Sequence, residues 1–251
     1  MNVKVSLIPA LSDNYIHLLQ WDDHAIVVDP AEALPVIDFL EQKKLKLKYI
    51  FNTHHHSDHT GGNQAIKAAT ACSIVGPKDE RIPQLDKAVS EGEDLQVPPL
   101  TFRIFFVPGH TSTHIAFFLT SQKLLFSGDT LFTGSCGRLF EGTPEQMIHS
   151  LQKLSSLPND TLIYCAHEYT QKNMEFANSL EPENDAVLRR LEKVNALRNK
   201  NCPTIPATLE EEKKTNPFLR VHEQAFKKNL HMENACDVEV FSHIRNLRNC
   251  F

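Results

Sequence analysis

The first two thirds of the chain alternate short apolar strands with amphipathic helices, and this pattern limits the possible folds most. Turn-bounded runs rich in β-branched and aromatic residues predict strands. These runs lie at residues 3–8, 15–20, 24–29, 47–52, 72–75, 101–107, 115–120, 124–126 and 161–165. Apolar residues at helical spacing predict a helix after Pro30 and a shorter one over 64–69. Such alternation is typical of an α/β protein.

Another helix is expected to start at Thr143-Pro144-Glu145-Gln146, a capping box with proline at the first helical position. Beyond about residue 170 the pattern becomes helical, with a break at Asn216-Pro217, and no further strand is expected. Apolar residues recur there with helical period at Val187, Leu188, Leu191, Val194 and Leu197. We therefore expect two domains, an α/β domain over residues 1–169 and an all-α domain over 170–251.

The composition argues against some classes of partner. The 251 residues carry 26 Lys and Arg against 31 Asp and Glu, a net charge of −5. A protein held to nucleic acid by bulk charge is normally basic. No apolar run approaches the roughly 18 residues of a membrane span, and the N-terminus lacks a signal-peptide pattern. The six cysteines form no C-x-x-C pair, which indicates reduced thiols. We expect a cytoplasmic monomer with no nucleic-acid or membrane partner.

The sharpest motif is the histidine cluster His54-His55-His56-Ser57-Asp58-His59, directly after the strand expected at 47–52. Imidazole nitrogens and carboxylate oxygens are ligands of zinc and similar cations. His54 and His56 point the same way if the extended backbone continues, and Asp58 and His59 turn to a second position. An open catalytic metal takes about three protein ligands. Four candidates in one loop therefore favour two metals.

A solvated polar loop or an expression tag is the alternative interpretation of this cluster. Tags lie at chain ends, whereas this run is internal and follows a strand of buried type. His55, between two candidate ligands, is expected to face away from them. A structural metal site in a binding protein is a second alternative. Such sites are closed and usually rich in thiolates, and this set contains no cysteine.

Three further metal-type residues each follow an expected strand: His110 in Pro108-Gly109-His110, Asp129 in Ser127-Gly128-Asp129, and His167 after Ala166. A single histidine at a strand end is more often a packed residue, but three residues in the same situation support one another. All nine glycines lie between Gly61 and Gly142. Four of them, Gly61, Gly62, Gly109 and Gly128, flank the candidate metal positions, where the backbone must turn sharply or approach closely.

Taken in order, H-x-H-x-D-H, G-H, G-D-T and A-H-E resemble the metallo-β-lactamase superfamily. Residues 53–62 (THHHSDHTGG), 134–142 (GSCGRLFEG) and 165–170 (CAHEYT) resemble the glyoxalase II, or hydroxyacylglutathione hydrolase, family within it. The resemblance runs from the first strand to the last residue. It implies an αββα sandwich of two mixed sheets with a C-terminal all-α region. It also implies that 1–169 is the catalytic domain and that 170–251 binds substrate.

The resemblance also implies a complete set of metal ligands. In the family pattern one metal is held by His54, His56 and His110, the other by Asp58, His59 and His167, and Asp129 bridges both. The expected cofactors are two divalent metal ions, zinc first and iron or manganese as other choices. Two such ions can hold a shared water and lower its pKa, so that hydroxide attacks the substrate. Asp58 would orient this metal-bridging hydroxide, and Thr111 and His114 would belong to the surrounding shell or to the packing around the site.

The implied reaction is hydrolysis of the thioester S-D-lactoylglutathione to D-lactate and glutathione, the second step of methylglyoxal detoxification. The substrate is anionic, and the family places positive charge near it. The matching positions here are Arg138, Arg245 and Arg248, and Tyr169 and Phe140 are the aromatic residues of the implied substrate site. Two of them depart from the usual family pattern: arginine stands at 248 where lysine is common, and Phe140 where some members carry tyrosine. Arginine can hold a carboxylate with two hydrogen bonds.

Other members of the same fold are the rival interpretations: a β-lactamase, a nuclease or phosphodiesterase, and a glutathione persulfide dioxygenase. The dioxygenase would need a mononuclear iron site with open positions for oxygen. The complete set of seven ligands and the long helical tail favour the hydrolase. A nuclease would need a basic groove, for which the sequence offers no candidate.

Overall fold

The computed structural model describes residues 3–251, and the chain divides into two compact units. The first unit comprises Met1–Phe106 and Thr113–Gly128, and the second comprises Val107–Ser112 and Asp129–Phe251. Among the described residues no helix is long and apolar enough to cross a membrane.

The first unit contains a mixed sheet with the strand order β1-β2-β3-β4-β5-β6. β1 to β3 are antiparallel, and β3 to β6 are parallel. The strands are β1 (Lys4–Ala10), β2 (Asn14–Trp21), β3 (His24–Val28), β4 (Lys46–Phe51), β5 (Ser73–Pro77) and β6 (Lys87–Val89). In the parallel part Val28 is level with Phe51, and Phe51 with Val75. The residues that follow β3, β4 and β5 therefore gather at one edge of this sheet.

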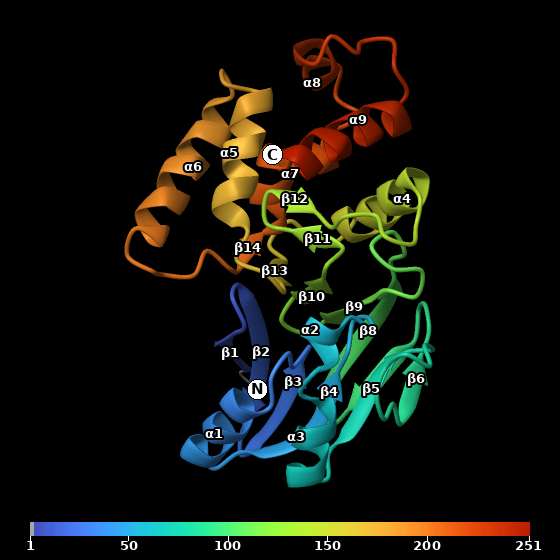
Figure 1. Ribbon diagram of the computed structural model, residues 1–251, viewed down its shortest axis with the longest axis vertical. Coiled ribbons are helices and arrows are strands. Elements are labelled where there is room, and N and C mark those ends of the chain that lie inside the picture. Colours follow the sequence, from blue (N-terminus) through green and yellow to red (C-terminus); the bar gives the residue numbers. More distant parts are fainter. Residues whose placement is uncertain (1–2) are drawn as a thin grey trace. The chain divides into compact units, whose positions relative to one another are not determined.

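Helices α1 (Leu34–Lys43) and α3 (Asn63–Thr70) cover the outer face of this sheet, and α2 (Ser57–Thr60) is a short turn of helix before α3 (Figure 1). Val36 and Leu40 of α1 and Ile66 of α3 share one apolar cluster with strand residues such as Ile50. Burying each such side chain stabilises the fold by about 1.5–3 kcal/mol.

A second sheet of the first unit runs in the order β10-β9-β8-β7, with antiparallel neighbours. Its strands are β7 (Asp94–Val97), β8 (Leu100–Phe106), β9 (Ile115–Leu119) and β10 (Leu124–Gly128). Phe51 of β4 stacks on Phe117 of β9, with centroids 4.5 Å apart, and meets Phe102 of β8 edge-on at 5.1 Å. The two sheets therefore pack face to face around a core of aromatic side chains.

The second unit is mostly helical. Its helices are α4 (Pro144–Ser155), α5 (Thr170–Leu180), α6 (Asp185–Arg198), α7 (Leu209–Thr215), η1 (Pro217–Leu219), α8 (Gln224–Asn229) and α9 (Asp237–Cys250). Its short strands are β11 (Leu131–Phe132), β12 (Ser135–Cys136), β13 (Leu162–Cys165) and β14 (Ala207–Thr208). α5 and α6 lie side by side (Figure 1), and Met174 and Ala177 pack against Val187 and Val194.

Most expected elements are confirmed. At Thr143 both halves of the capping box form: its hydroxyl accepts from the Gln146 N–H at 3.3 Å, and its own N–H donates to the Gln146 side chain at 2.9 Å. α7 ends just before the predicted break, and η1 begins at Pro217. The expectation of no strand beyond residue 170 is wrong, because β14 pairs with β13 through Ala207 and Thr208. The sequence interpretation also missed β7 and the two- and three-residue strands β6, β11 and β12, which are too short to show a period.

Candidate metal centre

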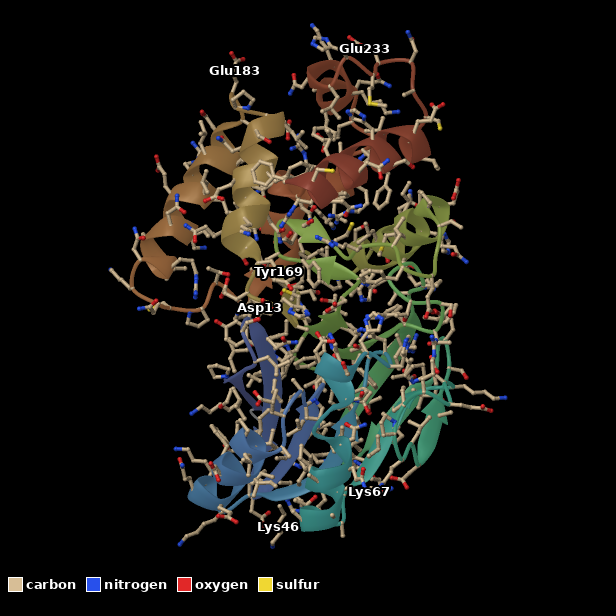
Figure 2. The ribbon with its side chains drawn as sticks, in the orientation of Figure 1. Asp13, Lys46, Lys67, Tyr169, Glu183 and Glu233 are labelled. Carbon is tan, nitrogen blue, oxygen red and sulfur yellow. The ribbon has the colours of Figure 1, made fainter. Side chains whose placement is uncertain are left out.

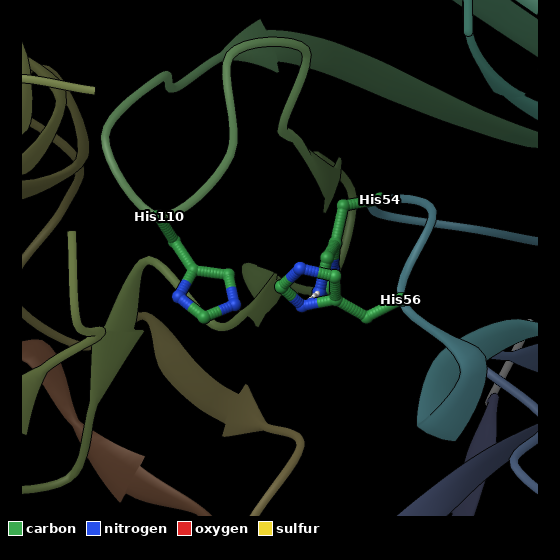
Figure 3. A group of neighbouring side chains, drawn as sticks. All are labelled: His54, His56 and His110. Atoms are coloured by element: carbon green, nitrogen blue, oxygen red, sulfur yellow. Dashed lines mark hydrogen bonds between the residues drawn. The ribbon is translucent and has the colours of Figure 1, made fainter. Parts of the chain in front are cut away.

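Four of the predicted ligands lie together in the first unit, at the end of β4 and in α2. The His54 and His59 rings are fully buried, and their centroids are 4.1 Å apart. His54 Nε2 lies 3.0 Å from His56 Nδ1 (Figure 3), and His59 Nε2 lies 3.4 Å from Asp58 Oδ2. The same view labels His110, on the loop that follows β8. The first unit thus groups three imidazoles and one carboxylate.

Glycines let the chain turn back at this point. A Cβ on Gly61 would lie 2.6 Å from the carbonyl oxygen of Ala31, and one on Gly62 would lie 2.8 Å from that of Pro30. Both distances are shorter than a real carbon–oxygen contact. The segment that follows β3 therefore packs directly against the turn between α2 and α3, and this close approach fixes where the ligand loop ends.

Asp29, which follows β3, is the buried partner of this loop and was missed from the sequence. It is 3 % exposed. Its carboxylate accepts from the Thr53 backbone N–H at 2.8 Å and from the Thr53 hydroxyl at 2.7 Å. His59 Nδ1 lies 3.0 Å from the same carboxylate. The negative charge of Asp29 beside Nδ1 favours the proton on that nitrogen, and Nε2 faces Asp58.

The Thr53 hydroxyl connects Asp29 to the His54 ring. Since it donates to Asp29, it accepts from His54 Nδ1 at 3.0 Å. The lone pair of His54 is then on Nε2, the atom near His56. His114, expected in the surrounding shell, is fully buried and stacks on His54 with centroids 4.6 Å apart. Neighbouring side chains thus set the direction of the buried imidazole.

Other side chains hold the two ends of the loop. Asn14 Nδ2 donates to the backbone carbonyl and to Oδ2 of Asp58, both at 3.2 Å, which fixes that carboxylate. His55 turns toward a different group, Asp79, with Nδ1 3.5 Å from the carboxylate. Hydrogen bonds from the Arg81 guanidinium hold the pKa of Asp79 well below its usual range.

The second unit contributes its own donor group from three separate strand ends. His110 Nε2 and His167 Nε2 each lie 3.4 Å from Asp129 Oδ2. His110 is 4 % exposed, His167 is 5 % exposed and Asp129 is 6 % exposed. His110 Nδ1 lies 2.9 Å from the backbone carbonyl of Arg138. A carbonyl oxygen can only accept, so His110 carries its proton on Nδ1 and its lone pair on Nε2.

Backbone contacts hold this second donor group in place. The N–H groups of Phe140 and Gly142 donate to the carbonyls of His110 and Gly109 at 3.2 and 3.0 Å. Segment 138–142 therefore runs against segment 109–112. A Cβ on Gly137 would overlap the carbonyl oxygen of Asp129, so this position needs glycine for space.

The donor atoms of both units fit divalent cations. With metal–ligand distances of about 2.0–2.1 Å, neighbouring donors around a tetrahedral zinc are about 3.3 Å apart. Within the units the separations are 3.0 Å for His54–His56 and 3.4 Å for His59–Asp58. For His110–Asp129 and His167–Asp129 they are also 3.4 Å. Where an imidazole nitrogen with a lone pair faces a carboxylate at this distance, the two repel each other unless a cation lies between them, so clusters with these spacings are suited to divalent metals.

Three arginines of the second unit gather without a carboxylate. Arg245 is 5 % exposed, donates to the Cys136 carbonyl at 2.6 Å and lies over the Phe218 ring. Burial, followed by the charges of Arg245 and Arg138, lowers the pKa of Arg248. Within residues 3–251 no acidic group pairs with any of the three guanidinium groups. Uncompensated positive charge of this kind favours an anionic ligand.

Two aromatic rings complete the predicted substrate set. Tyr169, just before α5 (Figure 2), stacks on His167 with centroids 4.7 Å apart and ring planes at 3°. Phe140 is 63 % exposed and meets His110 edge-on at 5.2 Å. Each predicted aromatic thus touches one of the second unit's candidate ligands.

Two family models match consecutive parts of the chain. The metallo-beta-lactamase superfamily model matches residues 12–167, and the model for the hydroxyacylglutathione hydrolase C-terminus matches residues 168–251. The hydroxyacylglutathione hydrolase of Methylococcus capsulatus is 45 % identical over 253 residues, which are 99 % of each chain. That of Pseudomonas fluorescens is 45 % identical over 257 residues, which are 99 % of this chain and 100 % of the relative.

Solved structures agree on the fold. The crystal structure of the BLEG-1 B3 metallo-beta-lactamase matches with a TM-score of 0.68 and 22 % sequence identity, covering 86 % of this chain and 99 % of the other. The metallo-β-lactamase fold expected from the sequence is therefore confirmed. With both family models in consecutive order and relatives 45 % identical over the full length, the chain belongs to the hydroxyacylglutathione hydrolase family of the metallo-β-lactamase superfamily.

Proposed function

We propose that this chain hydrolyses the thioester of S-D-lactoylglutathione to D-lactate and glutathione. One observation carries the proposal. The carbonyl of Arg138 accepts from His110 at 2.9 Å, and the guanidinium of the same residue belongs to an arginine group without a carboxylate. A single loop therefore joins a metal-type imidazole to a group suited to an anion. Relatives 45 % identical over the full length carry the name hydroxyacylglutathione hydrolase, which supports the assignment.

We propose two divalent ions per chain, zinc as the first choice. In this proposal His54, His56 and His110 hold one ion, Asp58, His59 and His167 hold the other, and Asp129 serves both. When bound, such ions lower the pKa of a coordinated water and polarise a carbonyl group. The contacts of Asp29 with His59, of Thr53 with His54 and of the Arg138 carbonyl with His110 support this set, because each favours a proton on Nδ1 and a lone pair on Nε2.

The side chains of the chain then have separate tasks. Asp58, held by Asn14 at 3.2 Å, accepts a hydrogen bond from the attacking water and orients it. The leaving group is a thiolate, which departs without protonation, so we assign no general acid. The buried walls around His54 and His59 exclude bulk water and strengthen the electrostatic interactions there. No serine or cysteine nucleophile is required.

The helical residues 170–251 are proposed as the substrate-binding domain. Glutathione carries two carboxylates and one ammonium, so it is a net anion. Arg138, Arg245 and Arg248 would attract its carboxylates, with Tyr169 and Phe140 beside them. Arginine suits this task because its planar fork matches a carboxylate. We also infer a cytoplasmic monomer, and the six free cysteines support a reducing compartment.

The proposal is tested by measuring the metal content of the purified protein and by parallel assays. The substrates are S-D-lactoylglutathione, a β-lactam, a phosphodiester and glutathione persulfide. We expect two equivalents of divalent metal, and turnover that is fastest on the glutathione thioester. Faster turnover of the β-lactam or the phosphodiester would overturn the assignment. Oxygen consumption with the persulfide, accompanied by one equivalent of iron, would favour the dioxygenase instead.

A further inference from the structure

Asn173, in the first turn of α5, connects two parts of the second unit and is absent from the predicted site. It is 1 % exposed. Its Nδ2 donates to the backbone carbonyl of Thr133, in the turn between β11 and β12, at 2.9 Å. A carbonyl accepts only, so the amide orientation is fixed and Oδ1 faces the other way. There Oδ1 accepts from Arg248 Nε at 3.2 Å and from Arg248 Nη2 at 3.0 Å.

These two bonds hold the guanidinium of Arg248 without cancelling its charge. Phe176 lies on one side of it, 6.0 Å from the ring centroid to Cζ. Within residues 3–251 no carboxylate pairs with Arg248. A neutral amide oxygen orients the guanidinium while leaving the full positive charge available to a ligand. An aspartate at the same place would form an internal ion pair and would compete with any bound anion.

We propose that Asn173 is a positioning residue that makes the site selective for a carboxylate-bearing thiol carrier, acting through Arg248. The inference rests on the proposed function, because it takes the tripeptide part of a glutathione thioester as the ligand. The contacts of Asn173 also explain how the fold accommodates an arginine at position 248. Lysine has one ammonium nitrogen and cannot donate from two positions in the fixed plane that Nε and Nη2 occupy.

The test is calorimetric binding of S-methylglutathione and of its diethyl ester, in which both carboxylates are blocked. The variants are Asn173→Ala, Asn173→Asp, Arg248→Ala and the double variant Asn173→Ala/Arg248→Ala. For Asn173→Ala we expect about 10–100-fold weaker binding of S-methylglutathione, as is typical when a hydrogen bond to a charged group is lost. We expect little change for the diester. Asn173→Asp should weaken S-methylglutathione binding further, because its carboxylate neutralises Arg248.

Removing Arg248 should abolish the effect of Asn173, so the double variant should bind S-methylglutathione no more weakly than Arg248→Ala alone. In steady-state assays Asn173→Ala should raise KM while kcat stays close to that of the wild type. The matched control is Glu175→Ala, an exposed residue of the same helix. It should leave both affinities unchanged.

A partly unfolded variant loses affinity for both ligands in the same proportion. The ratio of the two dissociation constants therefore reports on Arg248 rather than on folding. The inference is overturned if Asn173→Ala keeps the wild-type ratio, or if its effect persists in the Arg248→Ala background. A wild-type protein that binds S-methylglutathione but does not hydrolyse S-D-lactoylglutathione would refute the proposed function and leave the inference standing. A wild-type protein that does not bind S-methylglutathione would refute both the inference and the proposed function.

Discussion

The two units contain metal-type donors of similar chemistry that are built in opposite ways. In the first unit the donors His54, His56, Asp58 and His59 come from six consecutive residues at the end of one strand. In the second unit His110, Asp129 and His167 come from three separate segments. Their positions depend on contacts between distant residues, such as the Phe140 N–H to the His110 carbonyl. The first group is therefore local in the chain, and the second depends on long-range packing.

The groups that orient the imidazoles also differ in kind. In the first unit His59 is oriented by a side chain, the carboxylate of Asp29 at 3.0 Å. In the second unit His110 is oriented by main chain, the carbonyl of Arg138 at 2.9 Å. A substitution can remove the first partner but not the second. The two units should therefore respond differently to mutation, and this difference can be measured.

The largest expected effect comes from removing a carboxylate of either donor group. Asp58→Ala and Asp129→Ala should each lower kcat/KM for the thioester by about 1,000-fold or more, since each removes a charged ligand of the proposed metals. Asp129→Ala should also lose more metal, because Asp129 lies 3.4 Å from both His110 and His167. Kinetics and elemental analysis of the purified variants provide the measurement.

The controls for this experiment are Asp38→Ala and Glu192→Ala, exposed acidic residues of α1 and α6. Both should keep wild-type turnover and metal content. Far-UV circular dichroism of all four variants should show nearly unchanged helix content. Near-wild-type turnover of either Asp58→Ala or Asp129→Ala would show that the proposed two-metal site is wrong.

A glycine pair tests the close packing on which the second donor group depends. In Gly137→Ala the new Cβ would overlap the backbone oxygen of Asp129, and backbone cannot move as a side chain can. We expect a loss of about 3 kcal/mol or more in the free energy of unfolding. Gly92, in the first unit, has a φ of 74° and no atom within 4 Å of a new Cβ. Gly92→Ala should cost only about 1 kcal/mol, the strain of a left-handed backbone.

Chemical denaturation of both glycine variants gives this difference directly. Activity should follow it, with Gly137→Ala largely inactive and Gly92→Ala close to the wild type. Equal losses of stability would mean that Gly137 lies farther from the Asp129 carbonyl oxygen than in this structure. The second donor group would then not depend on this packing.

Much of the fold could be predicted because it is encoded locally. The capping box at Thr143 involves residues only three apart, and its two hydrogen bonds form as expected. Of the parallel strands, β3, β4 and β5 could be recognised because each contains an apolar run, such as Ile74-Val75 in β5. β14 could not, since its two residues show no period and are strand only because β13 lies beside them.

The candidate ligands could be proposed from the sequence for the same reason, whereas the residues that contact them could not. His54 and Asp58 belong to one motif, and His110, Asp129 and His167 each directly follow or closely follow an apolar strand. Asp29 offered one usable signal, an acidic residue directly after Val27-Val28 at a strand end. Asn173 offered none. An asparagine in an amphipathic helix becomes informative only when Thr133 and Arg248 are brought to its two sides.

The smallest expected effect separates the side-chain partner of the first unit from the main-chain partner of the second. In Asp29→Asn the new side chain should fit the existing backbone, because φ is 50° at this position and asparagine readily adopts such a conformation. The amide can place a donor opposite His59 Nδ1, which would move the imidazole proton to Nε2 and spoil that atom as a ligand. We expect about 10–100-fold weaker metal binding, measured by competition with a chelator. Arg138→Ala keeps the carbonyl that orients His110, so it should leave metal affinity unchanged and raise KM about 10-fold. Loss of metal affinity in Arg138→Ala, or its retention in Asp29→Asn, would contradict the difference drawn between the two units.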